Sequence, residues 1–290
     1  MPAQFARELC GYRAHGKPNT SDASDQFSVD LGRALFEAMG VDPGTVRVEP
    51  TGTPLSARVA ADLQAEVRRV GSSLQVTPEQ PLNAFEQYRH VDALKTIKPG
   101  SSKNLSQAWG KLTKFARTKV TSSKDSSRLD DLIAEVDAAL AADEDARWVL
   151  LAQAGHESLL KLDVVASRST NLAQSRQLEV GLSLKWSLRT DRAQDCRSQG
   201  AKLSSLRRGR MPHFAAVTME PRPYMLNLLG GGSGEVDCVY HLDLNALTIA
   251  VEQTCEGQPR RQSALETFQR LVEQRRLRDY DELVELVKNL

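Results

Sequence analysis

Short apolar segments in the middle of the chain predict the strands of a sheet. They are bounded by polar, Gly or Pro residues and are too short for buried helices. These predicted strands cover residues 159–166, 178–186, 212–218 and 236–242.

The segment at 178–186 shows the clearest strand pattern. Leucine or valine occupies every second position from Leu178 to Leu184, with Glu, Gly or Ser between them. A period of two is typical of a strand with one apolar face. Ser183 and Lys185 then share the opposite face, roughly 7 Å apart.

Helical periodicity dominates both sides of this central region. Apolar stripes at helical spacing predict helices over 27–39, 53–67, 82–96 and 128–154, with two more within 260–290. Residues 98–128 are rich in Ser, Lys and Gly, so we expect surface loops around a short helix that contains Trp109. A mobile segment that faces DNA is the alternative interpretation of the same composition.

The order of these elements predicts an α/β fold, a central mixed sheet flanked by helices. We expect a single domain over 1–290, with a helical part at 1–155, a sheet core at about 156–245 and C-terminal helices at 246–290.

Composition narrows the class of protein. The 290 residues are 40% hydrophobic and 26% charged, with a net charge of +1, which is ordinary for a globular protein. No run approaches the ~20 apolar residues of a membrane span, and the N-terminus has no apolar signal core, so a cytoplasmic protein is expected. The four cysteines are far apart, which favours reduced thiols over a disulfide or a metal site.

Asp163 is the first candidate for chemistry. It interrupts the apolar run of the strand at 159–166, where a carboxylate is costly unless it is paired, hydrogen-bonded or bound to a metal. With neighbouring oxygens it is suited to Mg²⁺, and Lys185 beside it would orient a water and stabilise the charge of a phosphoryl transition state. The alternatives are an Asp that caps a turn and a Lys that extends along the sheet face to solvent.

Positive charge gathers immediately after Lys185. Between Arg189 and Arg210 there are seven basic and two acidic side chains, a local net charge of +5, and a helix is predicted from about Asp191 to Leu206. Such a layout suits the binding of a phosphodiester. The Arg207-Arg208-Gly209-Arg210 segment is either a phosphate clamp or a solvated turn.

Three segments carry a resemblance to a known family. SLKWSLRTDRAQDCRSQG, GRMPHFAAVTMEP and GEVDCVYHLDL resemble the NgoMIV-type restriction endonucleases, in the CCGG-cutting branch of the PD-(D/E)XK nuclease superfamily. The similarity is specific over about 159–245 and fainter over the N-terminal helices, including 27–35 and 52–63.

The resemblance assigns roles to residues of this sequence. Asp163 matches the metal-binding acid of the PD strand, with Leu162 where Pro is usual. Ser183 and Lys185 match the S-x-K motif, with Lys185 as the catalytic lysine. The R-x-D-R segment that reads the CCGG core in the major groove is matched by Arg189, Asp191 and Arg192. Arg suits guanine O6 and N7, and Asp accepts from cytosine N4.

The sequence departs from the family pattern at two acids and one base contact. Gln199, fourteen residues beyond Lys185, and Ser56 stand where the family has glutamates. Glu179, Glu157 and Asp195 are the candidate substitutes. Met225 stands where the relative has an outer-base Arg, which makes Arg222 the candidate stand-in.

The resemblance implies a Mg²⁺-dependent type II enzyme that cuts a palindrome with a CCGG core, GCCGGC or a close variant. Cleavage would leave four-base 5′ overhangs, and the active form would be a homodimer or homotetramer on double-stranded DNA. One alternative is a sequence-specific DNA-binding protein with a weakened nuclease site, which the changes at Gln199 and Ser56 favour. Another is an unrelated protein-interaction module without salt-dependent DNA affinity.

Overall fold

The computed structural model describes residues 3–50, 53–91, 103–154, 160–170, 175–232 and 234–290. They fall into two compact units, residues 1–89 with 160–290, and residues 90–159. The single domain expected over 1–290 remains a prediction. The sequence pattern did not indicate the division into these two units.

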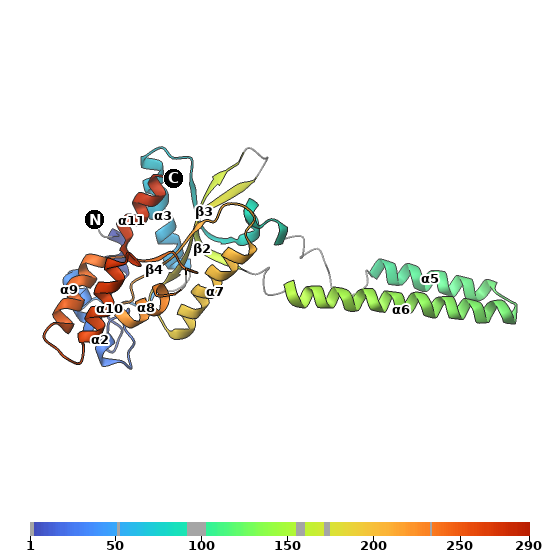
Figure 1. Cartoon of the computed structure of the whole chain (residues 1–290), viewed down its shortest axis with the longest axis horizontal. Coiled ribbons are helices and arrows are strands. Elements are labelled where there is room, and N and C mark those ends of the chain that lie inside the picture. Colours follow the sequence, from blue (N-terminus) through green and yellow to red (C-terminus); the bar gives the residue numbers. More distant parts are fainter. Residues whose placement is uncertain (1–2, 51–52, 92–102, 155–159, 171–174, 233) are drawn as a thin grey trace. The chain divides into compact units, whose positions relative to one another are not determined.

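The larger unit contains a six-stranded mixed sheet whose strand order follows the chain (Figure 1). Its strands are β1 (Gln75–Pro81), β2 (Lys161–Ser169), β3 (Arg176–Lys185), β4 (His213–Thr218), β5 (Cys238–His241) and β6 (Leu277–Asp279). The pairs β1–β2 and β2–β3 are antiparallel, and the pairs from β3 to β6 are parallel. The predicted α/β class and all four predicted strands are confirmed.

Helices surround this sheet. They are α1 (Gln4–Leu9), α2 (Gln26–Ala38), α3 (Thr53–Arg69), α7 (Thr190–Leu206), α8 (Pro223–Gly230), α9 (Leu244–Cys255), α10 (Gln262–Glu273) and α11 (Tyr280–Lys288). The α2 helix begins where the Asp25 carboxylate accepts a hydrogen bond from the Phe27 amide, an N-cap that satisfies one free N–H of the first turn. None of the helices within the described residues is long and apolar enough to cross a membrane.

The central strand β3 is more buried than its alternating pattern suggested. Its polar positions Glu179 and Ser183 are buried together with its leucines. Gly200 explains the second covered face: a Cβ atom there would lie 2.9 Å from the Phe214 ring on β4, so α7 packs directly on the sheet. Strands with parallel neighbours are usually covered on both faces.

The helix predicted over 82–96 is wrong over 82–89, while His90 and Val91 are helical as predicted. The edge strand β1 ends at Pro81, and two short 3-10 helices follow, η1 (Leu82–Ala84) and η2 (Glu86–Tyr88). Leu82, Phe85 and Tyr88 are buried at a spacing of three, which fits 3-10 geometry and imitates a helical stripe in the sequence. Residues 92–96 of that prediction lie outside the described residues.

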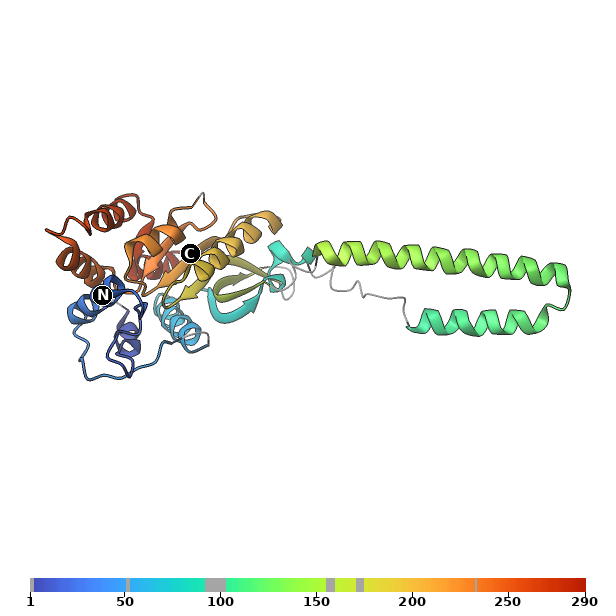
Figure 2. The ribbon, with the colours of Figure 1, turned by 90° about the horizontal axis from the view of Figure 1, so that it is seen from below.

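The smaller unit is a helical hairpin. Its helices are α5 (Lys103–Lys119) and α6 (Ser123–Ala154), which run antiparallel (Figure 2). The helix predicted over 128–154 is confirmed and begins earlier. The short helix expected around Trp109 is confirmed but is longer, covering Lys103–Lys119, so the surface loops expected beside it are wrong where α5 and α6 extend into them. The Trp109 indole donates a hydrogen bond to the Asp137 carboxylate on α6.

Candidate active site

Asp163 and Lys185 meet at one end of the sheet, where β2 and β3 are neighbours. The register Val164↔Leu182 continues to place Asp163 beside Ser183, two residues before Lys185. The Asp163 carboxylate accepts a hydrogen bond of 2.7 Å from the Leu184 amide. A cleft of about 230 Å³ opens here, lined by Pro50, Leu55, Asp163, Leu184, Lys185, Trp186 and Arg192.

The electrostatics of Asp163 show which charges surround it. Burial raises the pKa of its carboxyl, while the Leu184 amide and the Lys185 ammonium oppose that rise. The charges of Asp195 and Glu79 also act to raise the pKa, so both carboxylates lie within electrostatic range of Asp163. Acids from two other elements, α7 and β1, therefore act on Asp163.

Lys185 links β3 to the first half of α7. Its ammonium lies 3.4 Å from the Asp195 carboxylate, and its side chain is only 17% exposed. The Gln199 amide, one helical turn further on, donates to the same Asp195 oxygen at 3.4 Å. The carboxylate that Gln199 lacks is thus present one turn earlier on the same face of the helix.

Asp195 is one of the three acids that the sequence offered as substitutes for the lost glutamates. The other two are not seen to contact Lys185. Glu179 is buried and forms ion pairs of 3.7 Å with Arg168 and 3.6 Å with Arg210, which engages its charge away from Lys185. Glu157 lies outside the described residues.

Ser56 lies on α3 and contacts a carboxylate from another element. Its hydroxyl donates to the Glu79 carboxylate at 3.5 Å, and the Thr53 hydroxyl donates to the same oxygen at 2.7 Å. The Lys161 ammonium lies 2.6 Å from the second Glu79 oxygen. These bonds, with that of Lys161 the largest cause, lower the pKa of Glu79. Where the family has an acid on α3, this chain has a hydroxyl that touches an acid from β1.

Ser183 has different surroundings from the other candidate catalytic residues. It is fully buried beneath α7, beside the Cys196 thiol. All four cysteines are free and buried, as expected for reduced thiols.

The segment expected to read DNA forms the N-terminus of α7. Arg189 and Asp191 are exposed there, while Arg192 is half-buried. The Arg192 guanidinium donates to the Glu49 carboxylate at 3.0 Å and to the Ser187 carbonyl at 3.3 Å. Arg192 also lines the cleft that holds Asp163, so the predicted reading and cleaving residues adjoin.

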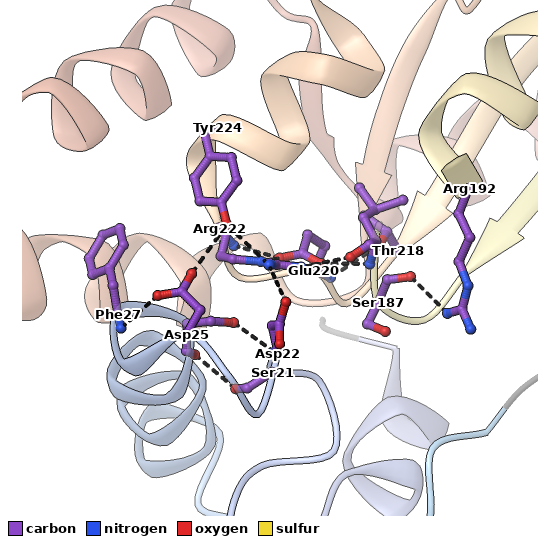
Figure 3. Close-up of polar contacts among 12 residues, drawn as sticks. Ser21, Asp22, Asp25, Phe27, Ser187, Arg192, Thr218, Glu220, Arg222 and Tyr224 are labelled. Atoms are coloured by element: carbon purple, nitrogen blue, oxygen red, sulfur yellow. Dashed lines mark hydrogen bonds and ion pairs between the residues drawn. The ribbon is translucent and has the colours of Figure 1, made fainter. Parts of the chain in front are cut away.

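Arg222 does not present the free guanidinium that a base contact requires. It is 2% exposed, and its Nε and Nη2 atoms donate to the two Glu220 oxygens at 2.6 and 3.1 Å (Figure 3). Nη2 also donates to the Leu188 carbonyl at 2.6 Å, and Glu220 accepts from the Leu188 amide at 2.6 Å. The expected outer-base role of Arg222 therefore conflicts with the geometry: this pair fixes the backbone immediately before Arg189.

The donor set is compatible with a hard divalent cation. Asp163 and Asp195 offer carboxylate oxygens near one another. Within the described part of the chain no three His, Cys, Asp or Glu side chains gather closely enough to form a metal cage. Mg²⁺ is commonly held by one or two carboxylates, waters and the phosphates of the substrate, so it does not need such a cage.

Sequence reasoning missed Glu79, Glu49 and Glu220. Glu79 lies between prolines in a segment for which no helix or strand was predicted, and it has a left-handed backbone with φ of 52°. Glu220 follows β4 in a segment interpreted only as a strand break. Each contacts a residue distant in sequence, which neither composition nor spacing indicates. For Glu220 the one available signal was an acid just past the end of a predicted strand.

Two comparisons with known protein sequences bear on the family of this chain. The sequence profile of the NgoMIV restriction enzyme family matches residues 63–286. The type II restriction enzyme NgoMIV of Neisseria gonorrhoeae is 41% identical over 106 residues, which cover 37% of this chain and 35% of that protein. The aligned stretch thus spans about a third of the relative's length. Because the family profile covers most of the chain, the chain belongs to the NgoMIV restriction enzyme family.

Proposed function

We propose that this protein is a Mg²⁺-dependent, site-specific endonuclease of double-stranded DNA. Its site would be a palindrome with a CCGG core, GCCGGC or a close variant, and cleavage would leave 5′ overhangs. The observation that carries the proposal is one cleft that contains Asp163, Lys185 and Arg192. It joins an acid and an amine suited to phosphodiester hydrolysis with an arginine suited to guanine.

Each side chain has a chemical task in this proposal. Asp163 and Asp195 would hold Mg²⁺, which polarises the scissile phosphate when bound. Lys185 would orient the attacking water and stabilise the negative charge that develops on the phosphate. Arg189, Asp191 and Arg192 would contact the base edges from the N-terminus of α7, a helix end that suits a groove.

Two carboxylates from other positions would replace the family's lost acids. Asp195 shares its environment with Gln199, and Glu79 contacts Ser56. We assign Asp195 to metal binding and Glu79 to positioning, since the Glu79 carboxylate is engaged by Lys161. This arrangement supports an active enzyme over a protein that binds DNA without cutting it.

Plasmid cleavage tests the proposal. Supercoiled plasmid with GCCGGC sites, protein and Mg²⁺ should yield fragments with 5′ overhangs, and Lys185→Ala should abolish them. Lys288→Ala, a charge-matched change on α11, should cut normally. A gel shift of the same DNA without cleavage by the unaltered protein would support the alternative of a DNA-binding protein and overturn the nuclease.

The assignment of Asp195 has its own test. Asp195→Asn should lower the cleavage rate by about 100-fold or more, as expected when a metal site loses a charged ligand. Adding Gln199→Glu should recover much of the rate, because it returns a carboxylate to the position one turn further on. Normal cleavage by Asp195→Asn at limiting Mg²⁺ would contradict the assignment.

The active form in this proposal is a homodimer or homotetramer. A palindrome presents the same half-site twice, which matches a protein with two-fold symmetry. Cytoplasmic action on DNA would accompany this activity.

A further inference from the structure

The helical hairpin, residues 103–154, has its own internal packing. The Trp109 indole donates to the Asp137 carboxylate at 2.8 Å, and Arg117 pairs with Asp130 at 3.2 Å. Ile133 is buried between the helices. These contacts define the inner face of each helix, the side that packs on the other helix. They also show which residues of α5 lie opposite which residues of α6.

The α5 helix carries a second apolar stripe that the hairpin does not cover. Leu105, Leu112 and Phe115 are 46%, 57% and 62% exposed, and the exposed Ala108 completes the stripe. Their spacing of three, four and three residues is that of a helix packed against another helix. At about 100° per residue the stripe lies roughly a quarter turn from the inner face marked by Trp109.

The α6 helix carries a matching stripe. Leu132 and Val136 are 52% and 36% exposed, and Ala139 continues the row. This row is also offset by about a quarter turn from the inner face, and in the same rotational sense as on α5. Because the two helices run in opposite directions, equal offsets bring both stripes onto one side of the hairpin. We call this side the outer apolar face.

We propose that the outer apolar face binds the same face of a second copy of this chain, forming a four-helix bundle. In such a bundle each helix touches two neighbours about a quarter turn apart, which is the offset found on both helices. This pairing would supply one interface of the homodimer or homotetramer proposed above. It rests on the proposed function only for the expectation that copies of the chain associate.

Charge selects the second copy as the occupant. The α5 helix has five basic and no acidic side chains, a net charge of +5, and α6 has eight acidic and three basic, a net charge of −5. A two-fold axis along the bundle places each α5 beside the partner's α6, so all neighbouring helices attract. The other face-to-face arrangement stacks α5 on α5 and would be repulsive.

The alignment of α5 with α6 along the hairpin axis predicts one ion pair across the interface. Trp109 lies opposite Asp137, and Arg117 lies opposite Asp130. The same alignment places Lys111 opposite Glu135, and both residues lie at the edge of the outer apolar face. A two-fold axis along the bundle does not shift residues along that axis, so Lys111 would lie beside the partner's Glu135.

Sedimentation of the full chain without DNA tests the surface. The unaltered protein should be a dimer or tetramer, and Leu112→Glu should weaken self-association by about tenfold or more. Val149→Glu is the matched control, since Val149 is 58% exposed on α6 but lies on neither stripe. Circular dichroism should show both variants equally helical.

A charge reversal tests the orientation. Lys111→Glu and Glu135→Lys should each weaken association, and the two changes together should restore it. A monomeric unaltered protein, or an unchanged mass for Leu112→Glu at every concentration, would overturn the proposal. Loss of DNA cleavage without a change of mass would overturn it as well, because the stripe would then serve another partner. Cleavage assayed separately distinguishes these results from a failure of the nuclease proposal.

Discussion

Replacing Arg222 by methionine tests whether this residue holds the fold or reads DNA. Methionine keeps the length and apolar stem of the side chain and removes its charge and all of its donors. Glu220, which is fully buried, would then keep only its bonds to backbone amides, those of Leu188 and residue 222. The Leu188 carbonyl would lose its donor.

The expected cost follows from this burial. Removing one partner of a buried ion pair leaves an uncompensated charge and typically costs about 3–5 kcal/mol. Arg222 and Glu220 are 2% and 0% exposed, so little solvent reaches the site to reduce that cost. For a chain of this size the melting temperature should fall by roughly 6–20 °C. Adding Glu220→Gln removes the stranded charge and should return part of the stability.

Urea unfolding followed by circular dichroism measures the loss. Arg58→Met is the control, since Arg58 pairs with Glu8 at 3.6 Å on the surface and should cost less than about 1 kcal/mol. Wild-type stability of Arg222→Met, combined with altered preference for the bases that flank CCGG, would refute this reasoning. It would restore Arg222 as a base contact.

Three further changes have expected outcomes. Gly200→Ala should destabilise the fold by about 1–3 kcal/mol or more in urea unfolding, because its Cβ would lie 1.8 Å from the Glu235 carbonyl oxygen; unchanged stability would disprove the close approach of α7. Burial disfavours the charged ring of His213, but the bond to Asp237 outweighs it and raises the pKa of His213 to about 9. The stabilisation from this bond is full below about pH 6.5 and should fade by up to about 3 kcal/mol as the pH rises through 9. A His213→Gln variant with the same pH profile would rule this out. Trp186→Ala should cost about 3–5 kcal/mol through its buried ring, with Trp186→Phe much milder, and equal losses for both would count against a packing role.

The central strands were predictable because their signal is local. The runs that became β2, β4 and β5 are mostly apolar over consecutive residues, and the run that became β3 alternates apolar residues with Glu, Gly and Ser. The edge strand β1 was not predictable in this way. It pairs on one side only, and its sequence QVTPEQP contains two prolines and four polar residues, which an edge position tolerates.

The residues of the candidate site also differ in whether a local pattern in the sequence indicates them. Asp163, Ser183 and Lys185 are marked by a strand pattern and by the spacing of a family motif, and the structure brings Asp163 and Lys185 into one cleft. Their roles remain predictions. The contacts of Glu79 with Ser56 depend on where β1 lies in space, which the composition of either segment does not indicate.

The burial of Arg222 shows a further limit of sequence reasoning. Arg222 was the candidate because it lies three residues before Met225, the position where the resemblance places an arginine that contacts the outer bases. Only the position of Glu220, two residues earlier on a turn after β4, engages it inside the protein. Spacing in the sequence does not reveal which way a turn directs its side chains.

The place where the hairpin joins the chain has a consequence for how this protein varies. The Leu82 amide donates to the Leu160 carbonyl at 3.0 Å, and Pro81 pairs with Lys161, so the chain leaves and returns to the sheet at adjacent positions. Seventy residues between 90 and 159 thus occupy what is topologically a single turn between β1 and β2. Such an appendage is free to lengthen, shorten or be exchanged over evolutionary time while the strand pairing beneath it stays intact.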